Sequence, residues 1–230
     1  MINYLDNNQI KLIGTIVSDK SFSHEVYGEG FYAFDLEVPR LSDTSDIIPV
    51  MISERLLADF DFHVGAKVVV DGQYRSYNNM DTVKNKLVLT CFVKEIRPQT
   101  EEDQNINSNE IILNGFICKK PIYRTTPFGR EIADILLAVN RAYNKSDYIP
   151  CIAWGRNARF CQSIEVGQNV KVFGRIQSRQ YEKKLDDGTS EIRRAYEVSV
   201  SKMEMESNEN KADENTENKA SNEEQIGYIS

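Results

Sequence analysis

Aromatic and basic side chains recur at alternate positions in two segments of this 230-residue chain. Successive side chains of a β-strand point to opposite faces. If residues 147–155 are extended, Ile149, Cys151 and Ala153 share one face, and Tyr148, Pro150, Ile152 and Trp154 share the other. If residues 169–183 are extended, one face carries Val170, Val172, Gly174, Ile176 and Ser178, and the other carries Lys171, Phe173, Arg175, Gln177, Arg179 and Tyr181. Each segment therefore combines an apolar face, suited to a core, with an outer face of mainly larger side chains.

An outer face that interleaves rings and cations can bind a single-stranded nucleic acid. Every base has a π-face, so Tyr and Trp can stack on it without reading its identity, at about 1–3 kcal/mol per base. Lys and Arg between the rings neutralise phosphates and release counterions. The alternative is that the rings pack against a neighbouring strand or a second subunit. Core packing does not call for interleaved arginines such as Arg175 and Arg179.

Residue types needed for catalysis or metal binding are not gathered in a recognisable pattern. The two histidines, His24 and His63, lie in separate segments with only Glu25, Asp59 and Asp61 near them. These are too few ligands for a metal signature, and we interpret both histidines as surface residues of polar loops. The chain has no phosphate-loop signature, and its Gly-Glu-Gly at 28–30 is too short for a dinucleotide motif. The sequence predicts no enzyme activity, no cofactor and no metal site.

The charge of the chain is unevenly distributed. The whole sequence has a net charge of −7, but residues 107–205 carry +5, whereas residues 1–98, 99–106 and 206–230 carry −4, −3 and −5. A polyanion would therefore bind the basic block and not the molecule at large.

An internal repeat divides the chain. Leu12-Ile13-Gly14-Thr15-Ile16 recurs as Leu113-Asn114-Gly115-Phe116-Ile117, an offset of 101 residues. Residues 46–49 match 147–150 at the same offset, and 72 and 76 match 174 and 178 after one insertion. We interpret the chain as a tandem duplication of a unit of about 100 residues, large enough for an independent domain.

Each unit has the pattern of five strands with one short helix between the third and fourth. The predicted strands are 10–18, 31–39, 47–53, 66–77 and 86–96, then 111–118, 131–140, 147–154, 169–182 and 194–203, with helices at 54–61 and 157–164 and a hairpin turn at 186–189. This order predicts an all-β chain of two tandem OB-folds, which are five-stranded Greek-key barrels. An SH3-like barrel with the same number of strands is the alternative.

The segments outside the repeat are polar. Residues 99–108 form an acidic, solvated linker, and residues 206–230 are dominated by Asn, Glu, Ser and Lys, which predicts a disordered acidic tail. The sequence has no run of about 18–20 apolar residues and no secretory signal, so we expect a cytoplasmic protein. Its four widely spaced cysteines are expected to be mostly buried free thiols.

The second unit resembles the bacterial single-stranded DNA-binding protein family. The resemblance runs through Asn109-x-x-x-Leu113-x-Gly115-x-Ile117, Pro121-x-x-Arg124-x-Thr126-x-x-Gly129, Leu137-Ala138-Val139-Asn140-Arg141, the run 147–156 and the run 174–181. It covers about seventy residues, and the motifs are specific in combination. The resemblance implies an OB-fold and proteins that coat single-stranded DNA without marked sequence preference.

The resemblance also implies site residues. The stacking positions of the family correspond to Tyr143, Tyr148, Trp154 and Tyr181, and its backbone contacts correspond to Arg124, Arg156 and Arg179. The strand pattern independently indicates Tyr148, Trp154, Tyr181 and Arg179, and it adds Lys171 and Arg175 as candidate nucleic-acid-binding residues. Tyr143 and Arg124 depend on the resemblance alone.

The first unit keeps the scaffold but differs at the binding positions. Ile47, Ser53 and Asn79 stand where Tyr148, Trp154 and Tyr181 stand in the second unit, although rings also occur at Phe22, Tyr27, Phe31, Tyr32, Tyr74 and Tyr77, and a basic residue at Arg75. We therefore predict a first OB-fold with a degenerate binding face at 1–98 and a second OB-fold that binds single-stranded DNA at 109–205. The first is expected to be a weaker binder or an assembly surface.

Two further expectations come from the family. Most members carry one OB-fold per chain and assemble as tetramers, so two per chain suggest a homodimer with four OB-folds. Their tails usually end in an acidic run and a hydrophobic tip that recruits replication and repair proteins, and residues 223–230 are a loose version of that tip. A tail that only aids solubility and competes with DNA for the basic face is the alternative.

The expected function is protection of single-stranded DNA during replication, recombination and repair. An OB-fold protein-interaction module, for instance a primosome or repair scaffold, is the first alternative, since fold does not fix function. A binder of single-stranded RNA is the second, because stacking and phosphate contacts serve both nucleic acids.

Overall fold

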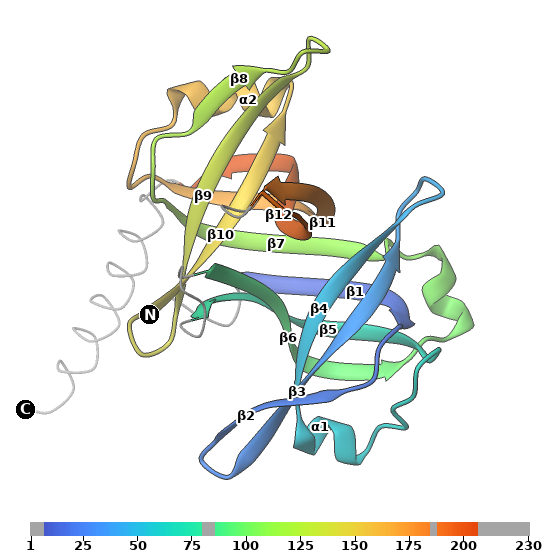
Figure 1. The fold of residues 1–230 in the computed structure, drawn as a ribbon. Helices are drawn as coiled ribbons and strands as arrows, with labels where there is room; N and C mark the ends of the chain where they lie inside the picture. Colours follow the sequence, from blue (N-terminus) through green and yellow to red (C-terminus); the bar gives the residue numbers. More distant parts are fainter. Residues whose placement is uncertain (1–6, 80–85, 185–187, 207–230) are drawn as a thin grey trace, which may run out of the picture.

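The computed structural model describes residues 7–79, 86–184 and 188–206, which form one continuous twelve-stranded sheet (Figure 1). The strand order is β2-β3-β4-β6-β5-β1-β7-β11-β12-β10-β9-β8. Additional pairing of β3 with β1, and of β9 with β7, closes each half of this sheet into a barrel. The chain is therefore two OB-folds in tandem, as the sequence predicted.

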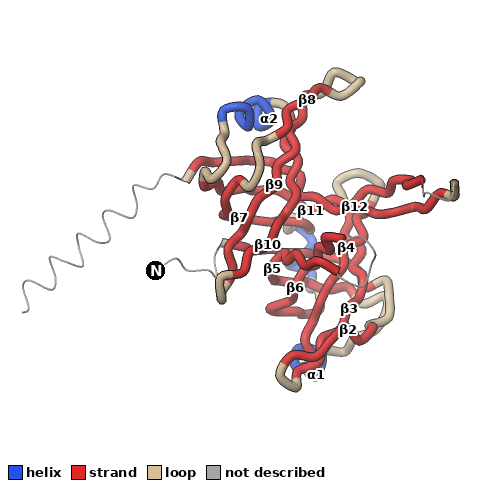
Figure 2. The backbone as a smooth tube through the Cα atoms, turned by 60° about the vertical axis from the view of Figure 1, so that its left-hand side comes forward, coloured by secondary structure: helices blue, strands red, loops and turns tan. Residues whose placement is uncertain are grey.

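Both barrels have the same order of elements. The first contains β1 (Asn8–Ile16), β2 (Ser21–Val26), β3 (Glu29–Pro39), β4 (Ser45–Ser53), α1 (Glu54–Ala58), β5 (Lys67–Asn79) and β6 (Lys86–Pro98). The second contains β7 (Asn109–Ile117), β8 (Ile122–Thr125), β9 (Glu131–Arg141), β10 (Lys145–Trp154), α2 (Arg156–Phe160), the short 3-10 helix η2 (Cys161–Ser163), β11 (Asn169–Lys184) and β12 (Ser190–Met205). Figure 2 shows α1 and α2 at opposite ends of the molecule.

The structure adds one strand to each predicted set of five. β2 and β8 form hairpins with β3 and β9, and every residue of β2 is exposed. A strand without a buried face has no alternation of apolar and polar residues, so the sequence pattern could not reveal it. The first predicted helix is shorter than expected, at 54–58, and the second consists of α2 at 156–160 followed directly by η2 at 161–163. Of the predicted turn at 186–189, residues 186 and 187 lie outside the described residues.

Alternate residues of the strands fill the two barrels. Leu12, Leu36 and Ile48 in the first unit and Leu113, Leu137 and Ile149 in the second are all fully buried, at equivalent positions of the repeat. Removal of this apolar surface from water is the main favourable contribution to folding, at about 25 cal/mol per Å².

The recurring glycine of the Leu-x-Gly-x-Ile motif has a steric role. A Cβ at Gly14 would lie 2.3 Å from the carbonyl oxygen of Glu37, and a Cβ at Gly115 would lie 2.5 Å from that of Ala138. At these positions β1 and β7 cross closely over β3 and β9 as each barrel closes. Only a residue without a side chain allows this approach of two backbones.

The two barrels are joined by their first strands. β1 and β7 pair antiparallel, with Ile10 opposite Ile111, so the units are related by an approximate two-fold rotation. The side chain of Asn8 exchanges two hydrogen bonds with the backbone of Tyr74, and Asn109 does the same with Ile176. These matched contacts follow from the sequence duplication.

The connector is more ordered than a solvated linker. It contains a 3-10 helix, η1 (Glu101–Asn105), and Arg97 holds the carboxylate of Asp103 through two hydrogen bonds of 2.7 and 2.6 Å. Asp103 is buried, and its bonds to Arg97 and Thr100 hold the pKa of its carboxyl well below the usual value. The predicted tail at 206–230 lies outside the described residues, except for Glu206.

The four cysteines are unpaired. Cys91, Cys151 and Cys161 are buried and Cys118 is half-buried. Burial raises the pKa of Cys91 to about 12 and that of Cys161 to about 11, so these thiols stay protonated. Within the described residues, no helix has the length and apolar character that would cross a membrane.

Candidate nucleic-acid interface

β10 presents Tyr148 and Trp154 on the outside of the second barrel. Its inward residues Ile149, Cys151 and Ala153 are buried, whereas Tyr148 is 47% exposed and Trp154 is 36% exposed. Alternation along the strand therefore places the two rings as predicted. Ile152 differs from the prediction, because it is only 6% exposed although it lies on the outer face. The outer face around Ile152 is covered by its neighbours and is not a uniformly open surface.

β11 brings a third ring and a cation to this outer face. Tyr181 is 37% exposed, and the guanidinium carbon of Arg179 lies 5.8 Å from the centre of its ring. Val170, Val172 and Ile176 on the opposite side of the strand are fully buried, as the alternation predicted. Arg179 also lies 3.9 Å from the carboxylate of Glu197 on β12. The hairpin of β11 and β12 extends beyond the barrel in Figure 2.

Tyr143 lies at the tip of the turn between β9 and β10. Its side chain is 94% exposed, and its backbone has φ 61°, in the left-handed region that is unusual for a residue with a side chain. Asn144 follows with φ 53°. A fully exposed ring held in such a turn contributes nothing to the core, which is consistent with a role in binding. Among the described residues, no ring–ring contact joins Tyr143, Tyr148, Trp154 or Tyr181 to another ring.

The arginines implied by the resemblance have different surroundings. Arg124 on β8 donates two hydrogen bonds, of 2.9 and 3.2 Å, to Asp134 on β9. Arg156 begins α2 directly after Trp154 and Gly155, is exposed, and has no ion pair with another described residue. Arg156 is therefore open to a phosphate beside Trp154, whereas Arg124 would have to share its guanidinium with Asp134.

Arg175 contacts the first unit, whereas Lys171 contacts a ring of its own strand. Strand pairing sets Arg175 beside Ser199, but its guanidinium lies 3.5 Å from Asp46 of the first unit. Lys171 lies where β11 pairs with β7, and its ammonium is 5.5 Å from the ring of Phe173. The alternation of β11 thus placed both residues on the outer face, but only the tertiary structure shows their partners.

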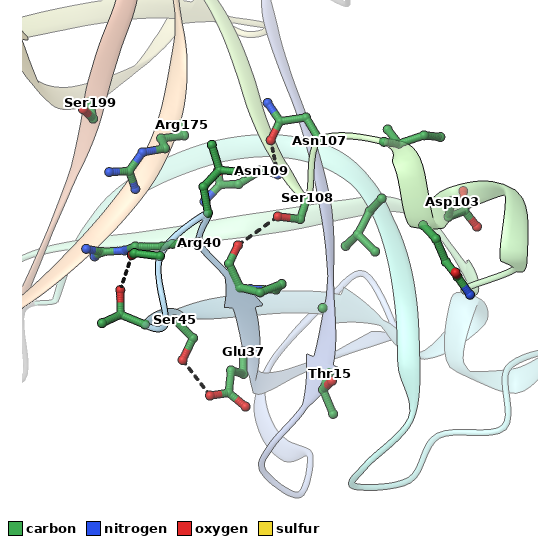
Figure 3. Close-up of a pocket in the computed structure, with 18 of the residues that line it drawn as sticks. Thr15, Glu37, Arg40, Ser45, Asp103, Asn107, Ser108, Asn109, Arg175 and Ser199 are labelled. Atoms are coloured by element: carbon green, nitrogen blue, oxygen red, sulfur yellow. Dashed lines mark hydrogen bonds between the residues drawn. The ribbon is translucent and has the colours of Figure 1, made fainter.

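A cavity of about 1150 Å³ lies at this junction (Figure 3). Its walls come from the connector, the 39–45 segment of the first unit, and strands β11 and β12. Many of the polar groups that line it bond to protein: Ser108 to the carbonyl of Pro39, Ser45 to Glu37, and Asp103 to Arg97. We interpret the cavity as a polar seam between the units, and we place the candidate interface on the exposed rings of β10 and β11.

Two buried carboxylates, one in each unit, accept a backbone hydrogen bond from the other unit. Asp46 accepts hydrogen bonds from the side chain of Arg40 and from the backbone amide of Ser178 in the second unit, at 2.7 and 2.6 Å. Asp147 accepts one from the amide of Ser76 in the first unit, at 2.8 Å. The amide of Tyr148 then donates to the hydroxyl of Ser76 at 2.7 Å. This pair of contacts fixes β10, and with it Tyr148, against the first unit.

The two carboxylates differ in electrostatics. Burial raises the pKa of Asp46, but the hydrogen bonds from Arg40 and Ser178 outweigh it and lower the pKa overall. Burial dominates at Asp147 and raises its pKa, because Arg141 is 3.7 Å away and does not bond closely. Burial and the nearby Arg141 lower the pKa of Arg75 to about 10. The carboxylate of Asp147 is therefore less well paired with its arginine than the carboxylate of Asp46.

Comparison with known proteins gives the family. The model of the single-strand binding protein family matches residues 108–206. Single-stranded DNA-binding protein B of Bacillus subtilis is 37% identical over 84 residues, which are 32% of this chain and 72% of that protein. The chain belongs to the single-strand binding protein family. Single-stranded DNA-binding protein 1 of Staphylococcus aureus is 38% identical over 81 residues, and there the chain spans 48% of the relative's length.

A solved structure is similar to this chain over both units. The wild-type single-stranded DNA-binding protein from Thermus aquaticus has a TM-score of 0.68, and the likeness covers 87% of this chain and 93% of that one. The two sequences are 18% identical, so this comparison supports the fold alone. The family resemblance inferred from the second unit is confirmed.

Sequence reasoning missed part of the first unit's surface. Tyr74, which was counted among its possible binding rings, is fully buried in the core. Phe92 was overlooked, although it lies on the outer face with the guanidinium carbon of Arg75 3.5 Å above its ring. His24 lies on strand β2, not in a polar loop, and stacks on Phe31. Phe92 could have been found from the alternation of β6, whose neighbours Cys91 and Val93 are buried.

Proposed function

We propose that this protein binds single-stranded DNA without marked sequence preference and protects it during replication, recombination and repair. One observation carries the proposal: Tyr148, Trp154 and Tyr181 are exposed on the outer face of the second barrel, with Arg156 and Arg179 beside them. Rings separated from one another leave a face free for each base, and the cations can neutralise phosphates. Binding of this kind involves no catalytic step and no cofactor.

The proposed interface is the set of exposed rings and cations of the second unit. It comprises Tyr143, Tyr148, Trp154, Tyr181, Arg124, Arg156 and Arg179, together with Arg175 at the edge toward the first unit and Lys171 where β11 pairs with β7. The binding unit is residues 109–205, joined through 99–108 to a first OB-fold at 1–98. The net charge of +5 over residues 107–205 supports this assignment, because it attracts a polyanion to this half of the chain.

The experiment is a titration of intrinsic fluorescence with oligo-dT at two salt concentrations. Trp154 is the only tryptophan of the chain, so the signal reports one position. We expect strong quenching and tighter binding at low salt, because a base stacks on the indole and counterions are released. Absence of binding would contradict the proposal and favour the protein-interaction module. Equal affinity for oligo-U would extend the substrate to RNA.

We further propose a homodimer with four OB-folds. The proposal is supported by the family resemblance and by the β1–β7 pairing, which already brings two OB-folds together within one chain. Light scattering after size exclusion should give twice the chain mass of 26.4 kDa. A mass of one chain would contradict it. Recruitment of replication or repair proteins through residues 206–230 is a separate proposal, testable by deletion of those residues.

A further inference from the structure

The hairpin of β11 and β12 leaves the body of the protein directly after Ser178 (Figure 2). Residues 169–178 of β11 are buried or half-buried, whereas residues 179–182 are exposed. This exposed arm carries Arg179 and Tyr181 of the proposed interface. The direction of the arm therefore decides where these two side chains meet a bound strand.

The edge of β11 that faces the first unit is held by side chains after its pairing with β7 ends at Gly174. Asn109 bonds to the amide and the carbonyl of Ile176, at 2.9 and 2.8 Å. Two residues further on, the carboxylate of Asp46 accepts hydrogen bonds from the amide and the hydroxyl of Ser178, at 2.6 and 3.2 Å. The first unit thus continues the series of hydrogen bonds on this edge up to the residue where the exposed arm begins.

Arg40 of the first unit also bonds to Ser178. Its guanidinium donates to Asp46 at 2.7 Å and to the carbonyl oxygen of Ser178 at 3.0 Å. The amide, the hydroxyl and the carbonyl of one residue of β11 are therefore all held by the other unit. Asp46 is fully buried and Ser178 is half-buried, so water competes little for these bonds. We call Arg40, Asp46 and Ser178 the anchor.

The sequence duplication provides an internal comparison for the anchor. Its equivalents are Arg141, Asp147 and Ser76, with the roles of the two units exchanged. Asp147 accepts the amide hydrogen of Ser76, but Arg141 lies 3.7 Å from Asp147, and its Nε has no hydrogen-bond partner among the described residues. The strand held by this looser contact, β5, has Asn79 where β11 has Tyr181. The closer contact therefore lies at the base of the hairpin that carries the proposed binding ring.

We propose that Arg40 and Asp46 of the first unit are positioning residues for the binding of single-stranded DNA by the second unit. They hold Ser178 and thereby set the direction of the arm. Tyr181 lies three residues beyond Ser178, about 10 Å along an extended strand. Binding groups must be held within about 0.5 Å of their productive geometry, so a small change of direction at Ser178 moves the ring away from a base. This inference rests on the proposed function.

Two variants with opposite changes of charge separate positioning from electrostatics. Arg40→Gln removes a positive charge, and Asp46→Ala removes a negative one. If the residues acted only through their charge, the first variant would bind a polyanion more weakly and the second more tightly. Because both variants loosen Ser178, we expect both to bind labelled oligo-dT at least about 5-fold more weakly, as after the loss of one stack. Unchanged or tighter binding by Asp46→Ala would overturn the proposal.

A double-mutant cycle with Tyr181 tests which contact is lost, and it needs only the milder Arg40→Gln variant, which keeps the bond between Asp46 and Ser178. In the native chain, Tyr181→Ala should weaken binding by about 5- to 150-fold, the range for one lost stack. In the Arg40→Gln chain the same change should cost less than about 5-fold, because the displaced ring no longer stacks fully. Trp154→Ala, on β10, should cost the same in both chains. An equal loss from Tyr181→Ala in both chains, or no loss in the native chain, would overturn the proposal.

Arg97→Gln is the matched control. Arg97 forms a similarly close pair with Asp103, at 2.7 and 2.6 Å, but this pair joins β6 to the connector. Both arginine variants remove one positive charge and one two-bond pair with a carboxylate. We expect the control to lose stability in urea but to keep its affinity for oligo-dT and the full effect of Tyr181→Ala. If the control reduces that effect as much as Arg40→Gln does, general destabilisation explains it and the proposal is wrong.

Hydrogen exchange measures the anchor without nucleic acid. The amides of residues 178–182 should exchange faster in Arg40→Gln than in Arg97→Gln, because the arm is no longer held at its base. The amides of residues 169–174, which pair with β7, should exchange alike in the two variants. Equal exchange over residues 178–182 would show that the anchor does not hold the arm.

Failure of this inference can be distinguished from failure of the proposed function. If oligo-dT quenches native Trp154 but Tyr181→Ala has the same effect in the native and Arg40→Gln chains, the anchor does not position the ring and the proposed function stands. If labelled oligo-dT does not bind the native chain, the proposed function is wrong and this inference fails with it.

Discussion

The two junction carboxylates should differ in their contribution to stability. Asp46 is fully buried and accepts hydrogen bonds from Arg40 and from the amide of Ser178, with Arg175 3.5 Å away. Asp46→Asn would leave two guanidinium groups without their counter-charge. Loss of one partner from a buried ion pair costs about 3–5 kcal/mol. Since both arginines are partly exposed, we expect the lower end, about 3 kcal/mol of unfolding free energy.

Asp147→Asn is the matched control at the equivalent position. Burial raises the pKa of this carboxyl, so the fold already disfavours its charge. An amide oxygen can still accept the hydrogen bond from Ser76. We therefore expect a change below about 1 kcal/mol, the size of an ordinary hydrogen-bond perturbation.

Unfolding in urea, followed by circular dichroism at equal protein concentrations, measures both variants. At neutral pH, equal losses for the two variants, or a loss below about 1 kcal/mol for Asp46→Asn, would refute the reasoning.

The pH dependence of the unfolding free energy provides a second check, because the pKa shifts of Asp46 and Asp147 have opposite signs. The pKa of Asp46 is lower in the fold than in the unfolded chain, so its contribution is present above the unfolded value of about 3.9 and is lost as pH falls toward the folded pKa. The deficit of Asp46→Asn should thus be constant from pH 7 to about 5. The pKa of Asp147 is higher in the fold than in the unfolded chain. The wild type should therefore gain stability relative to Asp147→Asn as pH falls through the folded pKa of Asp147.

Three further predictions concern the proposed interface and the fold. Trp154→Ala should weaken binding of labelled oligo-dT by about 1–3 kcal/mol, the value of one stacked base, and an unchanged anisotropy titration would move the bound strand to another face. Arg179→Ala should lower the salt slope by about 0.7, and a slope equal to that of the wild type would show that Arg179 makes no phosphate contact. Gly174→Ala should destabilise the second unit in urea, because its Cβ would lie 2.3 Å from the carbonyl oxygen of Ser199; a stability like that of the wild type would show that the backbone relaxes there.

Much of the fold could be predicted because each unit repeats a local pattern. Alternating apolar residues identified the long strands, and the repeated Leu-x-Gly-x-Ile identified the first strand of each barrel. β2 escaped detection because all of its residues are exposed, so it has no periodicity to detect.

The rings of the second unit were also predictable, because strand alternation alone determines the face on which a side chain lies. Tyr148, Trp154 and Tyr181 are exposed as that rule requires. The surroundings of Arg175 and Ile152 could not be predicted in this way, because they depend on neighbours from other strands. Arg175 lies by Asp46 of the other unit, and Ile152 is covered on the outer face.

By itself, the sequence determined the duplication, the barrel strands and the outward rings of the second unit, because these depend on spacing within short segments. The tertiary structure alone decided which residues from separate strands become neighbours. The row of His24, Phe31, Phe92 and Arg75 joins four strands, and the bond between Ser76 and Asp147 joins two units. Such contacts depend on the register of strands that are distant along the chain, and that register is set by packing of the whole barrel.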